Sequence, residues 1–124
     1  MVDQDRLTID EVVGDFVVIS FSEKVRKEGK LPEHRARKLL EEFDAYLSTY
    51  GANQEFCVNL GNFCLNSAYL GSLIEFGKKT PSLKVVTENE LTQETFNITK
   101  LANIYTIYSS YQEFLDNEID SKSQ

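Results

Sequence analysis

Apolar residues at the start of the chain first alternate with polar residues and then form a continuous run. Leu7 and Ile9 have polar neighbours up to Val12, and residues 16–21, which follow Gly14-Asp15, read Phe-Val-Val-Ile-Ser-Phe. Two such runs joined by a short turn are typical of a β-hairpin. Further apolar runs at 56–60, 82–87 and 104–108 predict three more strands.

Between these runs the apolar residues recur every three or four positions, which is the period of an amphipathic helix. The longest series ends before Gly51, a residue type that commonly closes helices, and consists of Ala36, Leu39, Leu40, Phe43, Leu47 and Tyr50. We expect its opposite face to be solvated; this face carries Arg35, Lys38, Glu42 and Ser48. Further helices are predicted from about 65 to 79, over 89–96, and from Ser110, which has capping-box spacing with Glu113.

The elements therefore follow the order β-β-α-β-α-β-α-β-α. This order predicts an α/β fold with an N-terminal β-hairpin, followed by alternating strands and helices in which parallel strands are joined by right-handed crossovers. The resulting mixed sheet would be covered by helices. The 124 residues suit a single domain over 1–124, with a core at about 7–118 and a polar tail at 120–124 that we expect to fray.

Charge narrows the choice of partner. Twenty Asp and Glu residues against thirteen Lys and Arg residues give a net charge of −7, the wrong sign for a phosphate backbone or an anionic membrane. Neither nucleic acid nor membrane is therefore an expected partner. The charge is uneven, because residues 24–38 hold seven basic and two acidic residues, a net +5, which leaves −12 for the rest. This basic segment could steer an acidic partner.

The chain lacks the features of a secreted or membrane protein. It has no apolar run of bilayer length and its first residues do not resemble a signal peptide, so we expect a cytoplasmic location. Cys57 and Cys64 lie in or beside an apolar strand and are predicted to be reduced, buried thiols, with a redox pair as the alternative.

Signatures of catalysis are mostly missing. The one histidine, His34, is surrounded by charged residues and has no second histidine to share a metal with. No glycine-rich phosphate-binding pattern occurs. The carboxylate pairs Glu41-Glu42 and Glu88 with Glu90 are expected by number in an acidic chain. We therefore predict no catalytic residue, no metal site and no cofactor, and treat a small enzyme as a remote alternative.

A polar pair, Asn66-Ser67, precedes the helix predicted at about 65–79. The hydroxyl of Ser67 could accept a hydrogen bond from the first helical turn and act as the N-cap. Alternatively, Ser67 could be phosphorylated, which would add about −1.5 to −2 charges at a helix N-terminus. Both interpretations remain open from the pattern alone.

The same stretch resembles a known family. Asn59-Leu60-Gly61-Asn62-Phe63 followed by Leu65-Asn66-Ser67-Ala68-Tyr69-Leu70-Gly71 is similar to the signature of the STAS domain, which in bacterial anti-sigma factor antagonists reads approximately N-L-x-x-V-x-[FIM]-D-S-[SA]-G-L-G. Gly29-Lys30-Leu31, and Ala36 with Leu39, resemble the elements G-x-L-D and A-x-x-L before and within the first helix. The resemblance covers about residues 7–118.

The resemblance implies a protein-interaction regulator and not an enzyme. Family antagonists bind an anti-sigma factor that is also a serine kinase, and phosphorylation of the serine at the start of the second helix breaks the complex. That serine corresponds to Ser67, the phosphorylation candidate. The implied partner-binding surface comprises Asn66, Ser67, Ala68, Tyr69, Ser72 and Phe76. The alternative within this class is an unphosphorylated STAS scaffold or accessory subunit of a signalling or transport complex.

Three positions depart from the family pattern. Asn66 and Pro32 stand where the family has aspartate, and Tyr69 stands in place of a glycine. Tyr69 and Phe76 are seven residues apart and Ser72 lies between them, so the three share one helical stripe. If exposed, this stripe would bind a partner; otherwise it would pack against a neighbouring helix.

Overall fold

The structure of the protein is a computed structural model that describes residues 6–28, 35–80 and 82–120. One five-stranded sheet forms its centre, with the strands in the order β1-β2-β3-β4-β5. These strands are β1 (Thr8–Val13), β2 (Phe16–Phe21), β3 (Glu55–Gly61), β4 (Lys84–Thr87) and β5 (Thr106–Tyr108). β1 pairs antiparallel with β2, and every later pair is parallel. The predicted α/β fold, with its hairpin and alternating elements, is confirmed.

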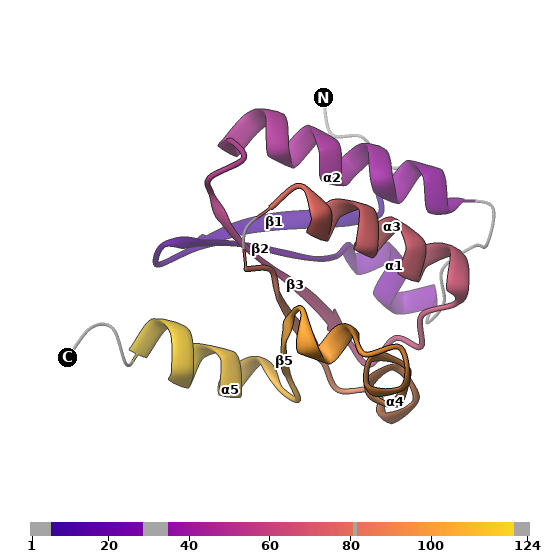
Figure 1. The fold of residues 1–124 in the computed structure, drawn as a ribbon. Coiled ribbons are helices and arrows are strands. Elements are labelled where there is room, and N and C mark those ends of the chain that lie inside the picture. Colours follow the sequence, from indigo (N-terminus) through magenta and orange to yellow (C-terminus); the bar gives the residue numbers. More distant parts are fainter. Residues whose placement is uncertain (1–5, 29–34, 81, 121–124) are drawn as a thin grey trace.

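Helices cover both faces of the sheet (Figure 1). The helical segments are α1 (Glu23–Glu28), α2 (Ala36–Tyr50), α3 (Ser67–Lys78), α4 (Glu90–Ile98), the 3₁₀ turn η2 (Leu101–Asn103), α5 (Tyr111–Phe114) and its π-helical continuation η3 (Leu115–Ile119). The larger core cluster lies under α2, α3 and α4, and a smaller cluster around Phe16 and Phe114 lies under α5. Within the described ranges, no helix is long and apolar enough to cross a bilayer.

Most of the predicted helix ends are found where expected. The N–H of Gly51, with φ +97°, donates to Leu47 O after the last turn of α2. Ser110 Oγ accepts a hydrogen bond from Glu113 N at 3.1 Å, as the capping-box spacing predicts.

Two strands begin later than predicted. β4 follows Ser82, whose φ of +51° is not extended, and β5 follows a turn in which Ile104 N and Tyr105 N both donate to Leu101 O.

The short helix α1 within the basic segment was not predicted. It holds one buried apolar residue, Val25, so no apolar period reveals it. Local bonds form it instead, because Ser22 O accepts from Arg26 N at 3.0 Å and Lys27 pairs with Glu23 at 3.2 Å. His34, the Gly29-Lys30-Leu31-Pro32 element and the tail residues 121–124 lie outside the described residues.

One residue of the α2 face predicted to be solvated is buried. Glu42 is 9% exposed, and its two carboxylate oxygens accept hydrogen bonds from Leu7 N and Thr8 N, each at 2.9 Å. Thr8 Oγ1 also donates to this carboxylate and contacts the Tyr46 hydroxyl at 2.8 Å. Glu42 therefore fastens the start of β1 to α2. The prediction was wrong here because a helical period cannot show that an edge strand begins beside the polar face.

The cysteines have different environments. Cys57 is fully buried in β3, and this burial raises the pKa of its thiol. Cys64, which was also predicted to be buried, is exposed in the loop after β3. Neither is in a disulfide.

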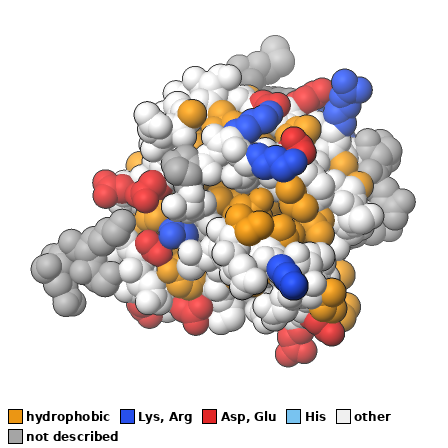
Figure 2. All heavy atoms as spheres, in the orientation of Figure 1, with side chains coloured by type: hydrophobic (Ala, Val, Ile, Leu, Met, Phe, Trp, Pro, Cys, Tyr) orange, Lys and Arg blue, Asp and Glu red, His pale blue; other side chains and the backbone are white. Residues whose placement is uncertain are grey.

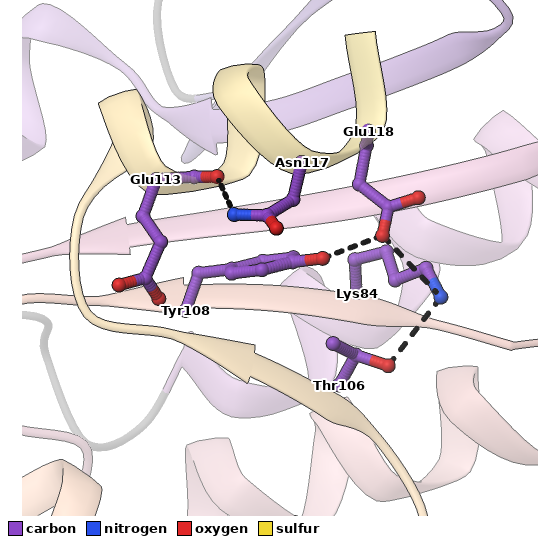
Figure 3. A network of polar contacts seen from close by, with 6 residues as sticks. All are labelled: Lys84, Thr106, Tyr108, Glu113, Asn117 and Glu118. Atoms are coloured by element: carbon purple, nitrogen blue, oxygen red, sulfur yellow. Dashed lines mark hydrogen bonds and ion pairs between the residues drawn. The ribbon is translucent and has the colours of Figure 1, made fainter. Parts of the chain in front are cut away.

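A polar network holds the C-terminal helix against the sheet (Figure 3). The Tyr108 hydroxyl donates to Glu118 Oε2 at 2.5 Å, and Lys84 Nζ lies 3.8 Å from the same oxygen. The side chains of Lys84 and Glu118 are each 15% exposed, so water screens this pair less than a surface pair. Lys84 Nζ also lies 3.4 Å from Thr106 Oγ1, which links the network to β5.

The raised pKa values of the tyrosines predict that the protein loses stability in alkali. The pKa values of all six are raised, by burial as the main cause in five of them, and in Tyr50 by the hydrogen bond that its phenol donates to Asp10. The folded protein thus holds these protons more tightly than the unfolded chain. Their contribution to stability is complete below pH of about 10, the ordinary tyrosine pKa, and is lost as the pH rises above it.

We therefore expect several tyrosinates to appear together, in one cooperative transition at a pH above about 10 that coincides with unfolding. The near-ultraviolet absorbance of the phenolates would follow their ionisation, while far-UV circular dichroism follows the fold. Gradual titration centred on the ordinary tyrosine pKa, with the dichroism unchanged, would contradict this expectation.

Candidate functional site

The helices α1, α3 and α4 follow the strands β2, β3 and β4, so all three begin at the same end of the sheet. β2, β3 and β4 are parallel neighbours, so their carboxyl ends meet there, which is the usual position of functional sites in open α/β sheets. Figure 1 shows α1, the first turn of α3 and α4 at one end of the sheet. The strand order therefore places the start of α3 between α1 and α4.

The loop between β3 and α3 is held in place by α4. Gly61, with φ +59°, turns the chain at the end of β3, and Asn89 Nδ2 donates to Asn62 O at 3.2 Å. Thr92 Oγ1 donates to Phe63 O at 3.1 Å and accepts from Leu65 N at 3.2 Å. These bonds give the first turn of α3 a defined position relative to α4.

Asn66, and not Ser67, is the N-cap of α3. Asn66 Oδ1 accepts a hydrogen bond from Tyr69 N at 2.9 Å, as an N-cap side chain does. Ser67 is the first residue of the helix and is exposed. The interpretation of Ser67 as the cap is therefore wrong. Its hydroxyl instead lies at the positive end of the α3 dipole, a place that stabilises an added anion.

Small residues surround Ser67 on the exposed face of α3. Ala68 and Gly71 are exposed, and a Cβ added at Gly71 would meet no described atom within 4 Å. Leu70 and Ile74 are half-buried at the flank of this face. A partner could therefore approach the backbone of the first two turns closely.

The stripe of Tyr69, Ser72 and Phe76 is not part of this surface. These side chains are 1%, 7% and 0% exposed, respectively. Phe76 stacks on Phe43 of α2 with the ring centroids 4.5 Å apart, and Ser72 Oγ donates to Ala36 O at 2.8 Å. Their inclusion among the partner-binding residues is corrected, because the stripe faces α2. Of the six predicted residues, Ser67 and Ala68 are exposed and Asn66 is half-buried.

Charged side chains lie on the two sides of Ser67, with a small basic excess on one side and acidic residues on the other. On the α1 side, the cations Lys24, Arg26 and Lys27 are exposed beside Glu23 and Glu28 of the same helix, and Lys27 pairs with Glu23. On the α4 side, the exposed acidic residues are Glu88, Glu90 and Glu94. The basic segment is visible in the sequence, whereas the tertiary fold is needed to place acidic residues opposite it.

Sequence analysis also missed the outer face of α4. Leu91 and Ile98 are 63% and 73% exposed, while Thr92 and Phe96 of the same helix are buried. Positions 91 and 98 are seven apart, so they lie one above the other on the helix. That spacing was the available signal, and it becomes informative once the buried face of α4 is known.

No protein-family model matches the chain, and no curated protein matches it significantly. Among solved structures, the chain is similar to the NMR structure of the protein TM1081, with a TM-score of 0.63 and 18% sequence identity. The alignment covers 94% of this chain and 92% of that one. At this identity the likeness concerns the fold, and it agrees with an α/β architecture that extends over nearly the whole chain.

Proposed function

We propose that this chain is a cytoplasmic protein-interaction regulator of the anti-sigma factor antagonist kind. It binds a protein partner, of the type that combines an anti-sigma factor with a serine kinase, through the start of α3. Phosphorylation of Ser67 by that partner ends the interaction. The observation that carries the proposal is the exposed Ser67 at the first position of α3, with the capping task taken by Asn66.

The switch follows from charge and solvation. A phosphate on Ser67 would bring about −1.5 to −2 charges to a surface of small residues that a partner can approach closely. The helix dipole stabilises this dianion within the free protein. When a partner docks, the same dianion must lose hydration, which weakens the complex unless a cation compensates for it.

The substitution Ser67→Asp tests the switch. We expect it to weaken partner binding at least about tenfold, because a carboxylate mimics part of the phosphate charge. A carboxylate in the first turn is also expected to stabilise α3 by about 0.3–1 kcal/mol, so the melting temperature should be unchanged or higher. Calorimetric titration with the partner gives the affinity, and thermal unfolding gives the stability.

Ser67→Ala and Ser48→Ala provide the controls, because both serines are exposed helical residues. Incubation with ATP and the partner kinase should add one phosphate to the wild type and to Ser48→Ala, and none to Ser67→Ala, by intact-mass measurement. If wild type gains no phosphate but still binds through this surface, the unphosphorylated scaffold takes the place of the switch. Unchanged affinity of Ser67→Asp would exclude this surface.

A further inference from the structure

The outer face of α4 combines exposed apolar and acidic side chains. Thr92 and Phe96 face the core, and at a helical period of about 3.6 residues Leu91 and Ile98 lie on one flank of the helix, turned away from this buried pair. Glu90 and Glu94 lie together on one side of these two aliphatic side chains, on the part of the helix farthest from the core, and are exposed. We define Glu90, Leu91, Glu94 and Ile98 as the α4 stripe.

A wider apolar region lies on the same molecule between α3 and α4. Figure 2 shows hydrophobic side chains gathered in the middle of one face of the molecule, over the space between α3 and α4. Half-buried hydrophobic residues of the adjoining elements are Leu70, Ile74 and Ala102. Ile104, just after η2, is 69% exposed. Exposed apolar side chains with charged neighbours are typical of a site for protein interaction.

The charges on the stripe select the occupant. Within α4, between Glu90 and Ile98, the sequence contains two glutamates and no basic residue, and the nearest cation along the chain is the exposed Lys100, two residues after Ile98. Anionic lipid and nucleic acid would be repelled. In a symmetric pair of two copies with antiparallel α4 helices, the two Glu94 residues would face each other beside the axis, because Glu94 lies midway between Leu91 and Ile98. Like charges at such a position disfavour self-association.

We propose that the α4 stripe binds a basic amphipathic helix of a partner protein. Apolar side chains of that helix, spaced over two turns, would cover Leu91 and Ile98, as in other groove-bound helices. Its lysines or arginines would lie opposite Glu90 and Glu94 and speed the encounter. This site goes beyond the proposed switch, since it does not require Ser67.

The test uses a synthetic 14-residue peptide of leucine and lysine arranged with helical period, and a matched peptide in which glutamate replaces every lysine. The leucine-lysine peptide should bind, and it should shift the amide resonances of residues 90–98 in the ¹⁵N-labelled protein. The glutamate peptide should not bind. The double substitution Leu91→Ser with Ile98→Ser should weaken binding at least tenfold, and Glu90→Gln with Glu94→Gln should weaken it mainly at low salt.

Matched controls separate this site from general acidity and from the switch. Val12 is 63% exposed, like Leu91, and lies on β1, so Val12→Ser should leave the affinity unchanged; Glu41→Gln on α2 should do the same. Ser67→Ala should bind the peptide as wild type does, whatever its phosphorylation behaviour. Resonance shifts spread over the acidic surface, or equal losses in Val12→Ser, would overturn the proposal. A dimer seen in sedimentation and abolished by Leu91→Ser would assign the stripe to a second copy instead.

Discussion

Replacing Phe76 with alanine is expected to destabilise the fold by about 4 kcal/mol, within the range for a buried aromatic residue. The ring is fully buried, stacks on Phe43 at 4.5 Å, and meets Phe56 edge-on with centroids 5.2 Å apart. Its removal would lose contacts with both α2 and the sheet. Since small domains have a total stability of about 5–15 kcal/mol, the variant should unfold at a much lower denaturant concentration than wild type.

Urea unfolding followed by circular dichroism measures this effect, and Ile98→Ala is the control. Ile98 is 73% exposed, so its truncation should change the free energy of unfolding by less than about 0.5 kcal/mol. If Phe76→Ala were as stable as wild type but deficient in partner binding, Phe76 would be an interface residue, contrary to its burial. Partner-binding experiments with Phe76 variants therefore need a stability measurement beside them.

Replacing Glu42 with alanine should cost about 3 kcal/mol, because hydrogen bonds to charged groups are strong and buried donors left without acceptors are costly. The substitution would remove the acceptor from Leu7 N, Thr8 N and Thr8 Oγ1. We expect the start of β1 to detach from α2. Hydrogen exchange at the amides of residues 7 and 8, together with urea unfolding, would measure the local and the global loss.

Glu41→Ala is the matched control, since Glu41 is the neighbouring glutamate on α2 and is exposed. This substitution should change the free energy of unfolding by less than about 0.5 kcal/mol. Glu42→Gln keeps one carbonyl oxygen as an acceptor, so its stability should lie between those of Glu41→Ala and Glu42→Ala. Equal stability of Glu41→Ala and Glu42→Ala would show that the buried carboxylate does not hold β1.

The position of Ser67 connects the proposed switch with the α4 stripe. Ser67 is exposed at the first position of α3, where Asn66 supplies the cap, and the loop before it is held by Thr92 of α4. The α4 stripe thus lies on the same helix that holds this loop. A partner that contacts both regions would combine a charge-sensitive contact at Ser67 with an apolar anchor on α4, and the peptide and Ser67 experiments measure the two contributions separately.

Much of the fold could be predicted from the sequence. The hairpin, the alternation of strands and helices, and the ends at Gly51 and Ser110 were all visible in the pattern. Prediction failed where a segment has too few apolar residues to show a period, as in α1 around Val25. It also failed where the backbone conformation of one residue sets the start of a strand, as the positive φ of Ser82 does before β4.

For the candidate site, the sequence correctly located the helix start at Asn66-Ser67 but could not show which of the two residues is the N-cap. Both side chains can cap a helix, and which of them does so depends on the backbone of the preceding loop. The same limit applies to Tyr69, Ser72 and Phe76. Their shared stripe was visible in the sequence, whereas its direction depends on α2.

The sequence by itself thus determined the order of the elements, the α/β class and the place of the polar pair before α3, because local periodicity records which face of each element avoids water. The tertiary structure decided which polar residues are buried and which apolar ones are exposed. Glu42 is buried by the start of β1, 34 residues away along the chain, and Leu91 stays exposed because Thr92 and Phe96 already face the core. Exposure is set by contacts between distant segments, and no local pattern contains them.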